Sequence, residues 1–108
     1  MTVNELMTAC GFEAVCLPDS EREVSGAYVG DLLSWVMGRA QEDNAWITIM
    51  SNINVIAVAS LSDVACVILA EGVTFDEELT KTAQQKEINV LKSSLPAYET
   101  AAKLIGKV

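Results

Sequence analysis

Histidine is absent from this chain of 108 residues. Acid–base catalysis by an imidazole and metal sites built on histidine are therefore excluded. The sequence also lacks the glycine-rich phosphate loop with its lysine, the dinucleotide-binding glycine pattern and the nucleophile elbow of hydrolases. A carboxylate or lysine enzyme is not excluded by motif alone. However, the acidic residues fall mainly at 21–23, 42–43 and 76–78, a pattern typical of solvated turns and a helix start. We expect no catalytic residues, no cofactor and no metal.

Basic residues and cysteines are also scarce. Seven Lys and Arg oppose fifteen Asp and Glu, and the net charge of −8 argues against a nucleic acid or an anionic membrane surface as partner. Cys10, Cys16 and Cys66 are odd in number and form no C-x-x-C pair. With no signal peptide at the N-terminus, they predict reduced thiols in a cytoplasmic protein. The alternative is a redox or metal role.

One apolar run, residues 53–70, has the length of a membrane span but carries a charge, Asp63, near its middle. An aspartate at mid-span costs about 2.5–3.5 kcal/mol on insertion scales. Ser60 and Ser62 stand beside it. The run therefore predicts a helix, a turn and a buried strand.

Strand-length apolar segments alternate with helical patterns along the chain. Strands are predicted at 13–17, 24–29, 46–50, 64–70 and 88–91. Helices are predicted at 3–10, 31–41, 54–61 and 74–86, with a last one between Pro96 and Gly106. This alternation indicates βαβ units and an α/β fold: a single three-layer domain over 1–108, with a mostly parallel sheet of about five strands and helices on both faces.

Capping residues and apolar stripes fix the expected helix starts and core faces. The expected caps are Thr2 with Glu5, Asp31, Asn52 or Asn54, and Thr74 with Glu77. The expected core stripes are Leu32, Leu33, Val36, Met37 and Ala40 in the second helix, and Ala97, Tyr98, Ala101, Ala102, Leu104 and Ile105 in the last.

Small polar residues follow the predicted strands. In parallel α/β sheets, ligands bind at the carboxyl ends of strands near helix N-termini. The candidate ligand-binding residues are Gly30, Asp31, Thr48, Asn52, Asn54 and Gly72. Backbone N–H groups there would favour a ligand with anionic or carbonyl oxygens, although Glu71 opposes an anion. The alternative is that each residue only caps a helix or forms a turn.

Two features predict a protein contact. The helix at 54–61 is apolar nearly all round, and in so small a chain one side needs a second chain to cover it. Trp35 points away from its helix's core stripe. It either contacts a partner or lies over Arg39 one turn later. We expect a homodimer burying at least about 1,000 Å².

The segments Gly30-Asp31-Leu32-Leu33, Trp46-Ile47-Thr48-Ile49 and 54–67 together resemble the DRTGG domain family, with the resemblance covering residues 13–105. In that family such domains accompany CBS domains in some inorganic pyrophosphatases, and the fold is similar to the N-terminal domain of HPr kinase/phosphorylase. The resemblance implies a regulatory role through dimerisation and ligand sensing. It implies no kinase activity, since the kinase's phosphate-binding domain is lacking.

Together these features predict a non-catalytic regulatory or assembly module. It would act as a homodimer and through a metabolic or redox protein partner. The alternative is a small-molecule sensor that binds a nucleotide or a phosphorylated metabolite at the strand carboxyl ends.

Overall fold

A single five-stranded sheet organises the chain. The computed structural model describes residues 1–108, and its strands are β1 (Glu13–Cys16), β2 (Ala27–Val29), β3 (Ala45–Thr48), β4 (Cys66–Leu69) and β5 (Val90–Lys92). They lie in the order β1-β5-β4-β3-β2. The strands from β2 to β5 pair in parallel, whereas β1 pairs antiparallel with β5. The predicted α/β class, with a mostly parallel sheet of about five strands, is confirmed.

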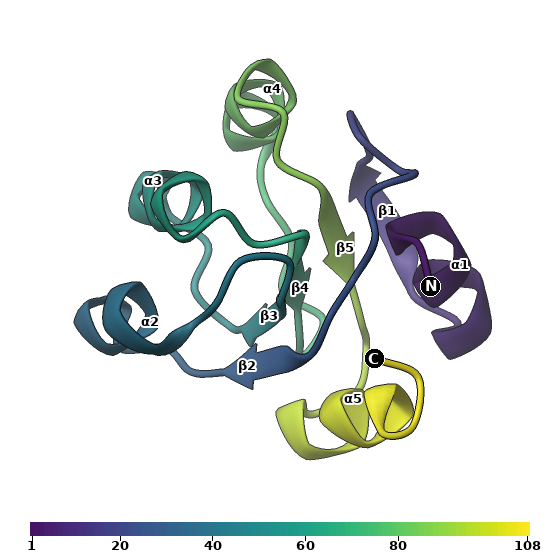
Figure 1. Ribbon diagram of the computed structural model, residues 1–108. Coiled ribbons are helices and arrows are strands. Elements are labelled where there is room, and N and C mark those ends of the chain that lie inside the picture. The colour runs from purple at the N-terminus through teal and green to yellow at the C-terminus, as the bar shows by residue number, and fades with distance from the viewer.

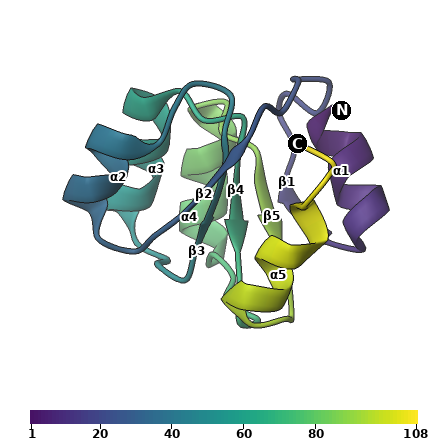
Figure 2. The same ribbon diagram turned by 60° about the horizontal axis from the view of Figure 1, so that its bottom comes forward.

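Five helices cover the two faces of this sheet (Figure 1). They are α1 (Val3–Cys10), α2 (Leu33–Arg39), α3 (Ile53–Ser62), α4 (Glu77–Gln85) and α5 (Ala97–Leu104). Helices α2, α3 and α4 share one core cluster with side chains such as Trp46 and Val67, and α1 and α5 share the other with Ile47 and Ile68. Figure 2 shows the resulting three layers, with the strands between the two groups of helices.

Alternation along the central strands explains the two cores. Successive side chains of a strand point to opposite faces. In β3, Trp46 therefore enters one cluster and Ile47 the other. All four residues of β3 and of β4 are buried, as expected for parallel strands covered by helices on both sides.

The apolar run at 53–70 divides as predicted. It forms α3, a turn, and then β4. Asp63 ends the helix in the left-handed conformation, with φ 54°, and its N–H bonds to the carbonyl oxygens of Ala59 and Ser60. No helix of the structure has the length and apolar content that crossing a membrane would require.

Several helix caps differ from the prediction. The capping box of Thr2 and Glu5 is present, and Asn52 rather than Asn54 caps α3. However, the N-cap residue of α2 is Leu32, which supplies no side-chain cap, and the Asp31 carboxylate bonds elsewhere. Helix α4 is capped by Asp76 through the N–H of Leu79, so the predicted cap at Thr74 is wrong.

The predicted core stripes were only partly right. In α2, Val36 is buried, but Leu32 and Met37 are more than half exposed because this short helix covers only the edge of the sheet. In α5, Tyr98 is 82% exposed and Ile105 80%. A buried polar side chain explains the exposure of Tyr98 and Ile105. The Thr100 hydroxyl bonds to Ser93 and to the Leu95 carbonyl, and these bonds set the rotation of the helix.

Candidate functional site

The predicted site residues lie at the carboxyl edge of the parallel strands, but they form three separate groups. Asp31 and Thr48 are in direct contact. The Thr48 hydroxyl donates to Asp31 Oδ1 at 2.7 Å, and the backbone N–H of Ile49 donates to the same oxygen at 3.0 Å. Thr48 is 98% buried, at 2% exposure, and its oxygen also accepts from the N–H of Met50. This pair therefore ties the end of β2 to the end of β3.

Gly30 stands next to this pair for a steric reason. A Cβ at this position would lie 2.8 Å from a ring carbon of Tyr28. The Gly30 carbonyl also accepts the indole N–H of Trp46 at 2.9 Å. Gly30 thus leaves room for the Tyr28 ring, and its carbonyl holds the largest fully buried side chain of the core.

The second group is the start of α3. Asn52 Oδ1 accepts from the N–H of Asn54 at 2.9 Å, which is the capping role expected of such a residue. Asn54 itself is exposed. Neither residue lines a cavity of the structure. A capping function explains Asn52 fully, and ligand contact by either residue stays a prediction.

Gly72 belongs to the third group, which lines a polar cleft of about 240 Å³. The lining residues are Gly11, Glu13, Gly72, Lys92, Ser93 and Ser94. Gly72 has a φ of 72°, and its N–H donates to the carbonyl of Ser93 at 2.9 Å. Lys92 Nζ lies 3.7 Å from Glu13 Oε2 across the cleft wall. Gly72 is the single predicted site residue that faces a cavity.

The topology explains why the cleft opens here. Crevices form where connections from neighbouring strands leave toward opposite faces of a sheet. The connections after β2, β3 and β4 lead to α2, α3 and α4 on one face, whereas the connection after β5 leads to α5 on the other (Figure 1). The carboxyl ends of β4 and β5 are therefore the switch point. The ends of β2 and β3 are not, and there the polar side chains bond to each other.

The ligand-binding residues predicted from the sequence include none of the other five lining residues, among them Gly11, Glu13 and Lys92. These last three reach the cleft because β1 pairs antiparallel with β5, which places Glu13 directly opposite Lys92. Only the opposite charges of these two residues could have indicated the pairing.

The three cysteines offer no accessible nucleophile. All are free and buried, and Cys16 donates its S–H to the carbonyl of Ile88 at 3.3 Å. Burial raises the pKa of each thiol, that of Cys66 to about 12. A thiol held neutral is a poor nucleophile and metal ligand. No group of three or more His, Cys, Asp or Glu side chains is placed to hold a metal ion.

The architecture defines the class: a three-layer α/β domain with one antiparallel edge strand and a polar cleft at its switch point. The model of the DRTGG domain matches residues 5–106, and the chain belongs to the DRTGG domain family. The resemblance inferred from residues 13–105 is thereby confirmed.

A solved structure shares the fold. It is the CBS and DRTGG regulatory region of Clostridium perfringens pyrophosphatase, complexed with the activator diadenosine tetraphosphate. The match has a TM-score of 0.73 at 14% sequence identity, and it covers 96% of this chain but 46% of that one. At this identity the likeness establishes the fold alone. No curated protein matches the sequence.

Proposed function

We propose that this chain is a non-catalytic, cytoplasmic regulatory module that acts through protein contacts. It forms a homodimer and binds a metabolic or redox protein. The observation that carries this proposal is the composition of the outer surface of α2 and α3. Helix α2 carries one charge, Arg39, and α3 carries none. In a chain with 22 charged residues (7 basic and 15 acidic), a two-helix surface with so little charge is typical of a contact that excludes water.

Exposed large side chains lie on these two helices and at the N-cap of α2. Leu32, Trp35, Met37, Ile53 and Leu61 are each more than half exposed. Trp35 stacks under Arg39, whose guanidinium carbon lies 3.7 Å from the ring centroid. Of the two arrangements predicted for Trp35, the stacking with Arg39 is the one observed within a single chain. The indole stays half exposed, and it remains available to a partner.

Light scattering at micromolar concentration tests the homodimer. We expect twice the chain mass of 11.6 kDa. A particle of single-chain mass at high concentration contradicts this part of the proposal.

Affinity capture with the chain as bait, compared with a Trp35→Ser bait, tests the proposed contact with a metabolic or redox protein. We expect the variant to lose the captured protein.

A specific observation favours a second candidate, a small-molecule sensor. The polar cleft at the switch point is lined by Lys92 and by two serines, Ser93 and Ser94. The related regulatory region binds diadenosine tetraphosphate, so this compound and ATP are the probes of choice. Glu13 and the nearby Glu71 oppose an anion, and binding should be weak or require a bridging cation.

Titration calorimetry with and without Mg²⁺ tests the sensor. If the cleft is the site, Lys92→Ala should abolish the heat of binding, whereas Asn54→Asp should leave it unchanged. If instead the start of α3 contacts the ligand, Asn54→Asp should weaken binding through its added charge. Absence of binding to the wild-type chain at millimolar probe rejects this candidate for these nucleotides.

A further inference from the structure

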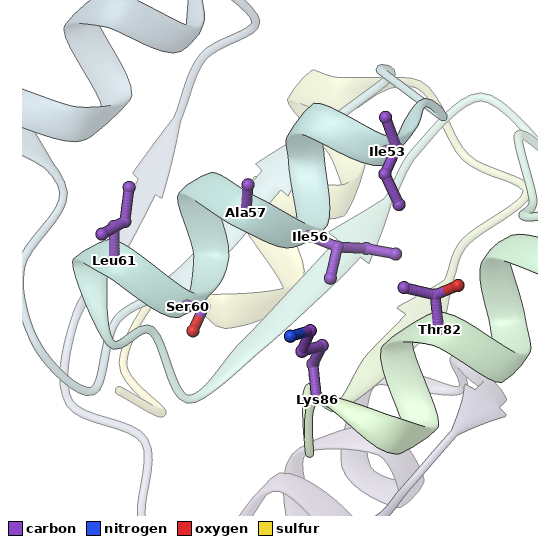
Figure 3. Close-up of a pocket in the computed structure, with 7 residues that line it drawn as sticks. All are labelled: Ile53, Ile56, Ala57, Ser60, Leu61, Thr82 and Lys86. Atoms are coloured by element: carbon purple, nitrogen blue, oxygen red, sulfur yellow. The ribbon is translucent and has the colours of Figure 1, made fainter.

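A groove runs between α3 and α4 on the outer surface of the molecule. One part, of about 270 Å³, is lined by Ile53, Ile56, Ala57, Ser60, Leu61, Thr82 and Lys86 (Figure 3). A second part, of about 380 Å³, is lined by Ile53, Asp76, Glu78, Leu79 and Thr82. The two parts share Ile53 and Thr82, so they form one continuous depression along the helix pair.

The α3 wall of the groove has the spacing of a helix-packing seam. Ile53, Ala57, Ser60 and Leu61 recur at intervals of four, three and one residues, and all four are exposed. Positions at i, i+4 and i+7 share one helix face. The small side chains of Ala57 and Ser60 at the centre permit another helix to approach closely.

The α4 wall has opposite charges at its two ends. Asp76, Glu77 and Glu78 stand at its start, and Lys86 follows its last turn. Glu78 and Lys86 both line the groove, and neither takes part in an ion pair within the chain. Eight positions apart on a helix, they are separated by about 12 Å along its axis. Figure 3 shows the Lys86 side chain extending toward α3.

We propose that this groove is the contact between two copies of the chain, packed antiparallel so that α3 lies on α3 of the second copy. In that arrangement the two-fold axis passes close to Ala57. Lys86 of each copy then lies opposite Glu78 of the other, and symmetry makes two such pairs. The inference rests on the proposed homodimer and assigns its surface.

Charge is the reason to choose a second copy over a foreign partner. Two chains of net charge −8 repel each other, and this repulsion is offset where opposite charges of the facing surfaces lie in register. The α3 stripe is uncharged, and the ends of α4 complement each other only in an antiparallel pair. A basic partner could pair with Asp76 and Glu78, but it would set its own positive charges against Lys86 and against the uncharged α3 stripe.

Disulfide trapping tests the position of the two-fold axis close to Ala57. The native cysteines are buried, so a cysteine introduced by Ala57→Cys is the accessible one. With oxidised glutathione we expect rapid conversion to a covalent dimer. The control is Ala102→Cys, an exposed alanine on α5 at the other face of the sheet, which should stay monomeric on a denaturing gel.

The outcomes separate this inference from the proposed function. A dimer by light scattering in which Ala57→Cys fails to cross-link overturns the assignment of the groove and leaves the homodimer standing. A single-chain mass overturns both. Equal cross-linking of the two cysteine variants indicates random collision and also rejects the groove.

Charge exchange tests the ion pairs. Lys86→Glu should weaken the dimer by about tenfold, because two attractive pairs become repulsive. Glu78→Lys should do the same, and the double variant should restore the wild-type affinity. The control Lys103→Glu makes the same change of charge on α5 and should have little effect. Failure of the double variant to restore affinity contradicts the pairing.

Discussion

The link between Asp31 and Thr48 decides whether these residues hold the fold or hold a ligand. One carboxylate oxygen accepts from the Thr48 hydroxyl at 2.7 Å and from the Ile49 N–H at 3.0 Å. Asp31→Ala removes both bonds and leaves a buried hydroxyl without an acceptor. A lost hydrogen bond to a charged group costs about 1.5–3 kcal/mol, and an unsatisfied buried group costs a similar amount.

Asp31 itself is exposed, and solvent screening lowers the combined cost of the lost hydrogen bonds and the unsatisfied hydroxyl. We therefore expect Asp31→Ala to reduce the free energy of unfolding by about 2 kcal/mol. For a domain of this size, the reduction corresponds to a fall in Tm of about 10 °C. Asp31→Asn keeps one acceptor oxygen and should cost about half as much.

Urea denaturation of a double-mutant cycle measures the link directly. Asp31→Ala, Thr48→Val and the double variant should give a coupling energy of about 1–2 kcal/mol. The control Asp19→Ala removes an exposed carboxylate that makes no side-chain hydrogen bond and should change stability by less than about 0.5 kcal/mol. A coupling energy near zero would refute the structural role and return both residues to the list of ligand contacts.

Two further predictions concern the Cys66 thiol and the Arg22 guanidinium. Burial raises the pKa of the Cys66 thiol from 9.0 to about 12, so the neutral form stabilises the native state fully below pH 9 and this stability is lost as the pH rises toward 12. Between pH 9 and 11 the free energy of unfolding of the wild type should fall more steeply than that of Cys66→Ala, by on the order of 1 kcal/mol per pH unit, measured by urea midpoints. Arg22 bonds to Asp43 Oδ1 at 2.9 Å and to both the carboxylate and the carbonyl of Asp63. Arg22→Met should cost about 1–2 kcal/mol, and less at high salt, whereas Arg39→Met should cost under about 0.5 kcal/mol.

Local signals in the sequence predicted the structure correctly where a side chain had a single available interaction partner. Thr2 and Glu5 form the predicted capping box because nothing else competes for either side chain. The run at 53–70 divides at Asp63 because a charged residue there can only be placed in a turn. The alternation of strands and helices along the chain likewise predicted the sheet and its layers correctly.

Prediction failed where a side chain forms its hydrogen bond with a residue that is distant in the sequence. Asp31 has the right position to cap α2, but Thr48 lies closer in the folded sheet and binds the carboxylate. Thr100 is polar, yet its bond to Ser93 buries it and turns Tyr98 outward. The cleft depends on the pairing of Glu13 with Lys92, which joins the two ends of the chain and has no local signature.

The cleft and the groove are connected by one short segment. Gly72 lines the cleft, and four residues later Asp76 lines the groove and caps α4. Between them, Phe75 is 5% exposed and packs in the core shared by α3 and α4, which couples the segment to the first turn of α4 through packing. That turn carries Glu78, the residue assigned to the second copy. If the proposed dimer and ligand sites are both correct, a ligand that displaces Gly72 would change the dimer contact directly. Dimer affinity measured with and without diadenosine tetraphosphate should then differ for the wild type but not for Lys92→Ala.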